Sequence, residues 1–273
     1  MRIVSVSENQ KIEKRIAITP EVAKKYIELG FDVSLSENYA EHLGIKDSEY
    51  KKNGTIISKD EKEIINSADI IVQLNLPIDD KISLIKENQT LVGVLNPYIN
   101  EDKIKELVKN KINIFSLELL PRITRAQSMD ILSSQANLAG YKAVLLAANE
   151  YPRIFPMMMT AAGSIKAAKV VILGAGVAGL QAIATAKRLG AIVEASDVRP
   201  SVKEQVESLG AKFIDVPLET DDEKKAALGE GGYAKSMPKS WMTRQAKEVA
   251  NRIAVADIVI TTALIPGKKA PTL

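Results

Sequence analysis

Short apolar runs alternate with amphipathic segments throughout the first half of the chain. Runs rich in Ile, Val and Leu predict strands at 2–6, 32–35, 69–74, 90–95 and 113–116. Apolar residues at helical spacing predict helices at 20–29, 60–67, 80–87 and 101–109. Pro20 fits the first turn of its helix, and Thr19 is expected to cap that helix. This alternation predicts a mainly parallel sheet that helices cover on both faces.

The same pattern starts again in the second half, with an almost wholly apolar run at 169–174. Further strands are expected at 191–196, 212–216 and 256–261, and a long loop is expected after the strand at 212–216. Helices are expected from the glycine turn to Leu189, near 202–209 and near 243–255. The three methionines at 157–159 are expected to pack in a core rather than to form a methionine-rich binding surface.

One long helix is predicted at 126–150, between the two halves, because Tyr151, Pro152 and Pro156 end a long helical stretch there. The pattern as a whole predicts an α/β fold of two doubly wound parallel-sheet domains, the second Rossmann-type, linked by this helix. The expected boundaries are 1–125 for the first domain, 126–165 for the linking helix and connector, and 166–273 for the second domain.

Composition narrows the class of protein. The 273 residues suffice for two domains, and 46% hydrophobic with 26% charged residues is typical of a soluble globular protein. The 37 Lys and Arg against 34 Asp and Glu are spread along the chain, so no nucleic-acid partner is expected. No uncharged apolar run reaches the roughly 18 residues of a membrane span, and the N-terminus does not resemble a signal peptide.

Catalytic side chains are few in this sequence. The absence of cysteine excludes a disulfide scaffold, a thiolate metal site and a thiol nucleophile. The single histidine, His42, lies near Gly44 in an expected loop and is interpreted as structural or exposed. No cluster has the spacing of metal ligands, so no metal is expected.

The strongest motif is GAGVAG at 174–179, placed between an apolar strand and a helix. In this context Gly174 permits a tight turn, Gly176 lets the backbone approach a diphosphate, and Gly179 lets the helix and strand pack closely. The N-terminus of the following helix would attract the diphosphate. Asp197 follows Gly174 by 23 positions and ends the second strand, where a carboxylate binds the adenosine ribose.

Asp197 also bears on which dinucleotide binds. A carboxylate there repels a 2′-phosphate and favours NAD over NADP. Arg199 lies two residues later and could attract that phosphate instead.

A second unusual segment, at 121–141, is polar for the entry to a linking helix. Helical spacing would place Gln127, Asp130 and Ser134 on one face, and Arg122 could pair with Asp130. Such a group could hold a planar carboxamide through hydrogen bonds. Helix capping combined with a surface ion pair explains the same residues.

Several stretches resemble the NAD(H)-binding component, the N-terminal part of the α subunit, of proton-translocating NAD(P) transhydrogenase. They are RAQSMDILSSQANLAGYKAV, GAGVAGLQAIATAKRLGA, SDVRP, EKRIAITP, GEGGYAKSM and ITTALIPGKKAP. The likeness covers essentially the whole chain, and RAQSMD is more specific than the glycine motif. In that family NADH passes a hydride directly to NADP⁺ on a partner component, and the Re/Si-specific transfer is coupled to proton movement through a membrane component.

The resemblance implies a set of site residues, with NAD(H) in the cleft between the two domains. Arg122, Asp130 and Ser133 would position the nicotinamide, and Gln127 would reach toward the second nicotinamide. The residues that would hold the dinucleotide are Gly174, Gly176, Val177, Gly179, Asp197, Val198, Arg199, Gln245 and Leu264. Gly232 and Tyr233 would belong to a mobile loop that closes over the cofactor. Three glycines before Tyr233, at 229, 231 and 232, fit such a loop, but they also fit an ordinary exposed loop.

The resemblance also implies partners and a location. NADP(H) would lie on a partner component, other components would span the membrane, and the chain would form a homodimer. It would be cytoplasmic and peripheral at the inner face of the cell membrane, held there through its partners. Because the family component normally continues beyond this point, the likeness implies a C-terminally truncated chain, whose fourth strand would be an exposed edge.

Two other functions remain open. Alanine dehydrogenase resembles the chain in architecture and in EKRIAITP, and Arg15 could clamp a substrate carboxylate. Asn75 and Asn96, however, fall where that family has its lysine and histidine, and neither amide can transfer protons near neutral pH. A non-catalytic NAD-binding module is the second alternative.

Overall fold

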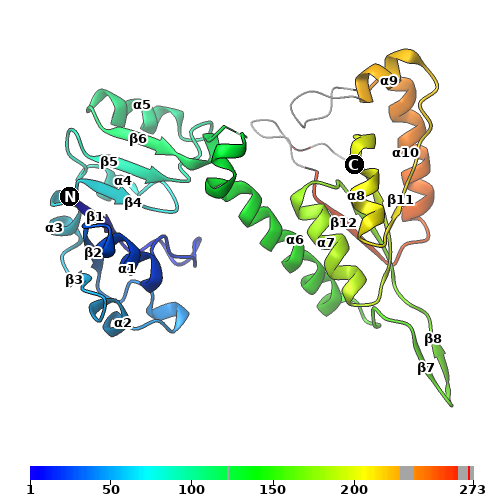
Figure 1. The fold of residues 1–273 in the computed structure, drawn as a ribbon, viewed down its shortest axis with the longest axis horizontal. Coiled ribbons are helices and arrows are strands. Elements are labelled where there is room, and N and C mark those ends of the chain that lie inside the picture. The colour runs from blue at the N-terminus through cyan, green and yellow to red at the C-terminus, as the bar shows by residue number, and fades with distance from the viewer. Residues whose placement is uncertain (122, 228–236, 264–269, 271–273) are drawn as a thin grey trace. The chain divides into compact units, whose positions relative to one another are not determined.

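The computed structural model describes residues 1–121, 123–227, 237–263 and 270, and divides the chain into two compact units. The first unit comprises Met1–Ile131 and the second Leu132–Leu273 (Figure 1). Each unit has its own parallel sheet and its own hydrophobic core, and each is described by itself.

Six parallel strands form the sheet of the first unit, in the order β3-β2-β1-β4-β5-β6. They are β1 (Arg2–Ser5), β2 (Asp32–Ser36), β3 (Ile56–Ser58), β4 (Ile70–Val72), β5 (Thr90–Gly93) and β6 (Asn113–Ser116). This is the strand order of a doubly wound dinucleotide-binding sheet, in which successive strands are added on one side of β1 and then, from β4, on the other. The five predicted strands are confirmed. The sequence does not reveal β3, whose only apolar residues are Ile56 and Ile57.

Helices cover both faces of this sheet, as predicted. The first face carries α1 (Pro20–Glu28) and α2 (Asp47–Lys51), and the other carries α3 (Glu61–Asn66), α4 (Asp79–Ile82) and α5 (Glu101–Lys109). Successive strand residues point to opposite faces, so Ile3 and Val4 of β1 enter different cores. Thr19 caps α1 by accepting a hydrogen bond from the Val22 amide, with Pro20 in the first turn, as expected.

The second unit has four parallel strands in the order β11-β10-β9-β12. They are β9 (Lys169–Leu173), β10 (Ile192–Ser196), β11 (Lys212–Phe213) and β12 (Ile258–Thr261). One face is covered by α6 (Ile131–Glu150), α7 (Val177–Arg188) and α8 (Lys203–Ser208), and the other by α10 (Lys239–Ile253). The helix α9 (Asp221–Ala227) lies in the segment that the sequence predicts as a loop. The predicted α/β fold with doubly wound parallel sheets is confirmed.

The long helix begins later than the sequence predicts. It is expected at 126–150, but α6 starts at Ile131, after a short 3₁₀ helix, η3 (Thr124–Met129). The break lies at Asp130, whose backbone angles, φ −74° and ψ 87°, are not helical. Periodicity alone does not distinguish a 3₁₀ turn from the first turn of an α-helix, because both repeat at about three residues.

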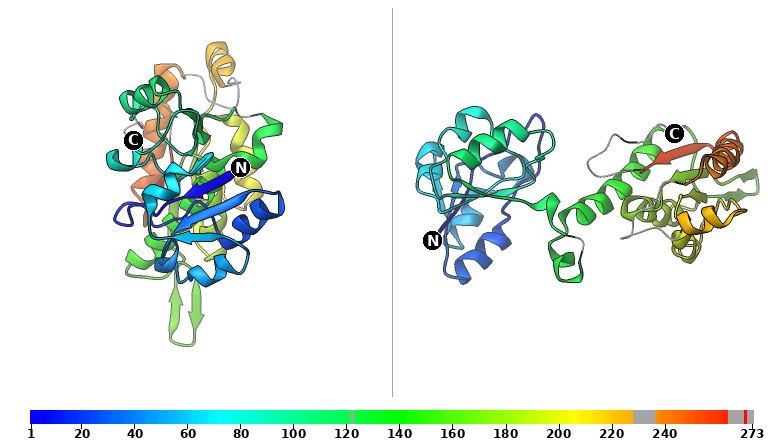
Figure 2. Two further views of the ribbon diagram at one scale, coloured as in Figure 1. Left: turned by 90° about the vertical axis from the view of Figure 1, so that its left-hand side faces the viewer. Right: turned by 90° about the horizontal axis from the view of Figure 1, so that it is seen from above.

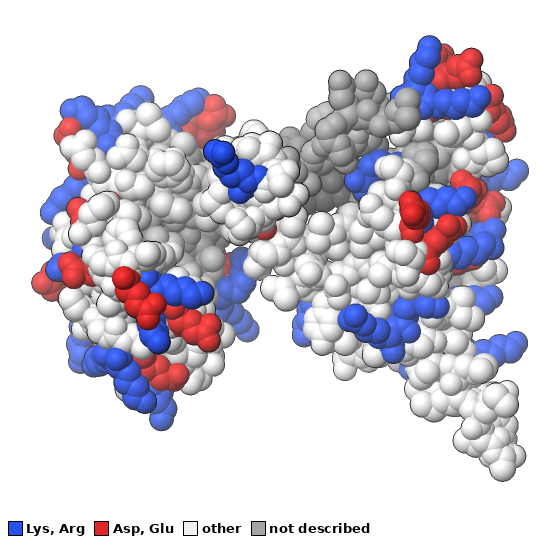
Figure 3. All heavy atoms as spheres, in the orientation of Figure 1, with Lys and Arg blue, Asp and Glu red and all other residues white. Residues whose placement is uncertain are grey.

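The expectation that the methionines at 157–159 pack in a core is wrong. They lie at the start of a two-stranded hairpin, β7 (Met158–Thr160) and β8 (Gly163–Ile165), with Met157 63%, Met158 48% and Met159 74% exposed. The hairpin projects from the rest of the second unit (Figures 1 and 2), and its end carries no charged side chain on the face in Figure 3. Apolar composition indicates burial only when the backbone lies within a layered core.

Close contact between α6 and α7 depends on a glycine. Gly140 is buried, and a Cβ atom there would lie 2.1 Å from the carbonyl oxygen of Ala178 in α7. This distance is impossible for a real carbon atom, so any side chain would force the two helices apart. The second unit therefore uses a small residue where backbone meets backbone.

We predict that Gly140→Ala destabilises the protein by about 1–3 kcal/mol, as overpacking does in tight interiors. The measurement is the free energy of unfolding in urea. Ala139→Leu, which adds volume at an exposed position of the same helix, should change it by less than about 0.5 kcal/mol. A stabilised Gly140→Ala variant would mean that helix propensity, worth about 1 kcal/mol, outweighs the contact, contrary to this prediction.

Candidate functional site

The turn between β9 and α7 carries the glycine motif in the expected geometry. Gly174 has φ +97°, and its amide donates to the carbonyl oxygen of Ser196 at 2.8 Å. A Cβ on Gly179 would lie 1.8 Å from the Gly174 carbonyl oxygen, whereas a Cβ on Gly176 would meet nothing within 4 Å. Gly174 and Gly179 are thus needed for the turn itself, and Gly176 faces open space among the described residues.

The first turn of α7 is available for an anion. Gly176 is its N-cap and provides no side chain, so no side chain caps the amides that follow. Val177 is the first residue of the helix and is 41% exposed. Uncapped amides and the helix dipole attract negative charge at such a position.

Asp197 lies directly after β10 and ties that strand to the glycine turn. Its side chain is only 7% exposed, and its Oδ2 accepts a hydrogen bond from the Ala175 amide at 2.8 Å. Arg199 supplies three further donors: its amide at 2.8 Å and Nε at 3.0 Å to Oδ1, and an η nitrogen at 3.0 Å to Oδ2. The carboxylate is therefore pre-positioned between the turn and a guanidinium.

The pKa of Asp197 lies below its ordinary value of 3.8. Burial raises this pKa, but the hydrogen bonds from the Arg199 side chain and from the Ala175 and Arg199 amides outweigh burial. Asp197 is therefore ionised at neutral pH, as a ribose-binding carboxylate must be.

Thr262 also shapes the turn, and the sequence pattern does not identify it as a site residue. It follows β12 directly, where the strand order of the second unit reverses, and its Oγ1 donates to the Gly174 carbonyl oxygen at 2.8 Å. A Cβ on Gly174 or Gly179 would lie 3.0 Å from the same hydroxyl oxygen. A hydroxyl at the end of the strand that neighbours β9 is the signal that could have identified it.

Two further candidates, Val198 and Gln245, belong to the same end of the second unit. Gln245 of α10 donates through Nε2 to Ser196 Oγ at 3.3 Å. Val198 packs against a small core of Val216, Met237 and Trp241. The described second-unit residues predicted to hold the dinucleotide or line its site thus lie at the carboxyl ends of β9 and β10, apart from Ser133. They are Gly174, Gly176, Val177, Gly179, Asp197, Val198, Arg199 and Gln245.

The predicted helical face of Gln127, Asp130 and Ser134 is wrong. Gln127 is exposed in η3, Asp130 is half-buried at its end, and Ser134 belongs to α6. The three residues therefore do not lie along one face of a single α-helix. The backbone amide of Asp130 donates to the carbonyl oxygen of Gln127. Gln127 and Asp130 belong to the first unit, and half-buried Ser133 to the second.

Four of the predicted residues lie outside the described residues. They are Arg122, Gly232, Tyr233 and Leu264.

In the first unit, Arg15 and Asn75 lie near one another around Glu13. Arg15 donates through Nε to Glu13 Oε1 at 2.9 Å, and Asn75 donates to Glu13 Oε2 at 3.4 Å. This pairing lowers the pKa of Glu13 to about 2, because the Arg15 hydrogen bonds exceed the effect of burial. The backbone amide of Asn96 donates to Glu118 Oε1, and Asn96 has φ +47°. Arg15, the residue that could clamp a substrate carboxylate, is thus already paired with the carboxylate of Glu13.

Other candidate chemistry is sparse in the described part of the chain. No group of three or more metal-ligating side chains gathers there. None of its helices has the length and apolar character needed to cross a membrane. His42 is exposed, and its Nε2 donates to the Lys14 carbonyl oxygen at 2.8 Å, in agreement with a structural role.

Comparison with known proteins identifies two matching family domains. "Alanine dehydrogenase/PNT, N-terminal domain" matches residues 5–139, and "Alanine dehydrogenase/PNT, C-terminal domain" matches residues 143–273. The chain is similar to a NAD(P) transhydrogenase subunit alpha protein of Rhodospirillum rubrum, with 48% identity over 100% of this chain and 72% of the relative. The alanine dehydrogenase of Methanococcus maripaludis is 24% identical over 96% of this chain and 64% of its own length.

Among solved structures, the transhydrogenase of Sinorhizobium meliloti is similar to the chain, with a TM-score of 0.83 and 47% identity. The match covers 98% of this chain and 72% of that one. Similarity in sequence and similarity in structure thus both lead to transhydrogenase proteins.

We predict that Asp197→Asn makes stability less dependent on pH. Because its folded pKa is depressed, Asp197 contributes stability that is present above about pH 4 and is lost as the pH falls through the folded value. At pH 7 the variant should be less stable by about 1.5–3 kcal/mol, the worth of hydrogen bonds to a charged group. Urea unfolding from pH 7 to pH 3 should show this difference shrinking; a constant difference would contradict the assignment.

We predict that Thr262→Val loosens the glycine turn, because valine keeps the shape but leaves the Gly174 carbonyl oxygen without the Thr262 donor. The expected cost is about 1–3 kcal/mol in thermal or urea unfolding. Thr261→Val, at the exposed neighbouring position, is the matched control and should have little effect. Equal effects of the two substitutions would show that the hydroxyl does not hold the turn.

Proposed function

The chain belongs to the alanine dehydrogenase/PNT family, with transhydrogenase alpha subunits among its high-identity relatives, and from this we propose that it is the NAD(H)-binding component of a proton-translocating transhydrogenase. In this proposal NADH bound to the chain transfers a hydride directly to NADP⁺ on a partner component. The membrane component that couples transfer to proton movement is a separate polypeptide.

The observation that carries the proposal is the buried, ionised Asp197 beside the uncapped start of α7. A diphosphate fits this helix start, because Gly176 leaves the approach open and the first-turn amides lack a side-chain cap. A sugar docked beyond the diphosphate would bring its hydroxyls to Asp197 at the end of β10. The residues present therefore fit an adenine dinucleotide.

Arg199 adds a step to cofactor binding. A carboxylate has about four acceptor positions, and the Ala175 amide with the three donors of Arg199 fills four. A ribose hydroxyl that binds Asp197 would take the place of a guanidinium N–H. A 2′-phosphate would meet the carboxylate itself, so we expect preference for NAD(H).

The nicotinamide half is assigned to the polar segment before α6 and to the first turn of that helix. Arg122, Asp130 and Ser133 would position the carboxamide, and Gln127 would face the partner's nicotinamide. Bound NADH supplies the hydride from its nicotinamide ring, so the protein needs no acid or base for this step. The residues would act by orienting the ring and by excluding water.

The quaternary arrangement is also part of the proposal. The chain would act as a homodimer, bound to NADP(H)-binding and membrane-spanning components at the inner face of the cell membrane. This arrangement would bring NAD(H) and NADP(H) together.

Amino-acid dehydrogenation is the less supported alternative. Arg15 is paired with Glu13. Asn75 and Asn96, at the positions of the lysine and histidine of alanine dehydrogenase, cannot exchange protons near neutral pH. Low identity to alanine dehydrogenase agrees with this ranking.

The binding test is calorimetric titration of the chain with NADH and NADPH. NADH should bind more tightly, and Asp197→Ala should weaken NADH binding by about tenfold or more while the variant remains folded. Preference for NADPH, or unchanged affinity in the folded variant, would overturn the assignment of Asp197.

The catalytic test adds the NADP(H)-binding component and follows reduction of an NADP analogue by NADH. Hydride transfer supports the proposal. Binding without transfer would favour a non-catalytic NAD-binding module, and NADH turnover with pyruvate and ammonia by the chain alone would favour an amino-acid dehydrogenase.

A further inference from the structure

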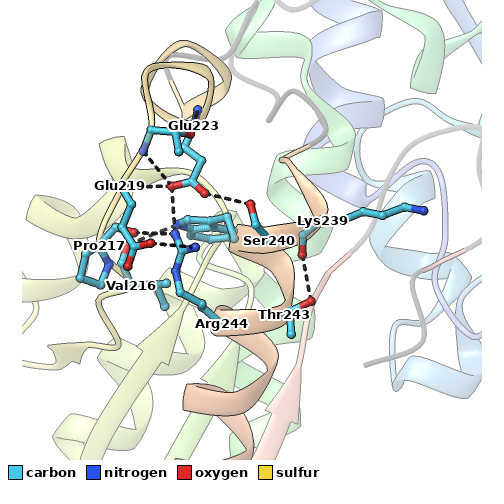
Figure 4. Close-up of polar contacts among 10 residues, drawn as sticks. Val216, Pro217, Glu219, Glu223, Lys239, Ser240, Thr243 and Arg244 are labelled. Atoms are coloured by element: carbon cyan, nitrogen blue, oxygen red, sulfur yellow. Dashed lines mark hydrogen bonds and ion pairs between the residues drawn. The ribbon is translucent and has the colours of Figure 1, made fainter.

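A buried carboxylate holds together the region beside the proposed dinucleotide site. Glu223 of α9 is 0% exposed, and its two oxygens accept hydrogen bonds from several directions (Figure 4). Oε2 accepts from the Glu219 amide at 2.7 Å and from an η nitrogen of Arg244 at 2.9 Å, and Oε1 accepts from Ser240 Oγ at 3.1 Å. The carboxylate thus joins the segment before α9 to the first two turns of α10.

Arg244 extends this network. Its η nitrogens also reach the Pro217 carbonyl oxygen at 3.2 Å and Glu219 Oε2 at 3.3 Å. Burial raises the pKa of Glu223, but the hydrogen bonds of the Glu219 amide, Arg244 and Ser240 outweigh burial, so the pKa lies below its ordinary value. Glu223 is therefore a paired, buried anion.

Helix α10 is linked to residues on both sides of Asp197, the proposed ribose-binding residue. Gln245, the residue after Arg244, donates to Ser196 Oγ at 3.3 Å. Trp241 lies one turn earlier, and its Nε1 donates to the Val216 carbonyl oxygen at 3.3 Å. Val198 packs against the core that Trp241 forms with Val216 and Met237. Ser196 is thus bonded directly to α10, and Val198 packs against the core to which Trp241 of α10 belongs.

A fixed α10 is therefore a condition for a fixed Asp197. A sideways shift of α10 would move the partners of Ser196 and Val198 together, and the Asp197 carboxylate would move with the backbone between them. A buried ion pair is weak evidence for stability, but its hydrogen bonds define one relative position of the elements it joins. An apolar contact tolerates sliding more readily.

We infer that Glu223 is a positioning residue for the adenosine half of the dinucleotide. It touches no cofactor itself; it fixes α10 through Arg244 and Ser240. Helix α10 in turn holds Ser196 through Gln245 and supplies Trp241 to the core against which Val198 packs. The inference rests on the proposed function, because it assumes that a ribose docks on Asp197.

The test compares Glu223→Gln with Asp257→Asn. Asp257 accepts from the Lys169 amide at 2.9 Å and pairs with Arg153. These contacts lie at the amino ends of β9 and β12, opposite the glycine turn. Both substitutions remove a charged, hydrogen-bonded carboxylate from the second unit, so Asp257→Asn reports the effect of destabilisation alone.

The ligands are AMP and NADH, titrated calorimetrically. Glu223→Gln should weaken both by a similar factor, about tenfold, because a misplaced site loses the adenosine contacts that the two share. In the reconstituted hydride-transfer assay KM for NADH should rise while kcat at saturation is unchanged, since uniform binding is lost. Asp257→Asn should lower Tm without changing either affinity.

A second measurement does not require a bound nucleotide. Amide hydrogen exchange of the peptide that contains residues 196–199 should accelerate at least threefold in ligand-free Glu223→Gln and remain unchanged in Asp257→Asn. Ser240→Ala, which removes one donor and keeps the ion pair, should show the same effects in smaller measure. It replaces Glu223→Gln if that variant does not fold.

The outcomes separate the two proposals. If wild-type protein fails to bind NADH, the proposed function fails, and the exchange measurement alone decides whether Glu223 positions the segment. If wild-type protein binds NADH but Glu223→Gln changes only Tm, as Asp257→Asn does, then Glu223 is merely structural and the inference is wrong.

Discussion

The second unit depends on the hydrogen bond between the Asp197 carboxylate and the Ala175 amide. This 2.8 Å bond joins the end of β10 to the glycine turn after β9, so the proposed sugar site and the proposed diphosphate site are held at a fixed separation. Thr262 closes the turn from the opposite neighbour, β12, through the Gly174 carbonyl oxygen. Three adjacent strand ends therefore build one surface, which we infer α10 helps to hold in place through Ser196.

The sequence predicts this surface, except for Thr262, because its rules are local. A tight turn needs Gly174 at φ +97°, and close packing of strand and helix needs Gly179 without a side chain. Buried parallel strands are nearly continuous apolar runs, which makes β9 conspicuous. A carboxylate at the end of the next strand follows from the topology of the fold. Each of these signals lies within a few residues of the feature that it specifies.

Features that depend on distant contacts could not be predicted in the same way. Glu223 lies in a charge-rich stretch whose mixed signs are typical of a solvated turn, yet its side chain is buried and bonded to Arg244 and Ser240, about twenty positions away. The methionines at 157–159 have the composition of core residues, but their backbone forms a projecting hairpin. Only tertiary structure reveals which apolar or charged side chains are enclosed.

The first unit shows that strand order alone does not make a dinucleotide site. Its sheet also reverses between β1 and β4, where ligands bind in such folds. There, however, Glu8 occupies the corresponding edge and accepts the Leu74 amide at 2.7 Å, and Gln73 pairs with Ser5 and Val6. In the first unit the Glu8 carboxylate already accepts a backbone amide at this point, whereas the start of α7 offers its amides without a side-chain cap. The side chains at the two reversal points thus explain why the adenosine half is proposed to bind in the second unit.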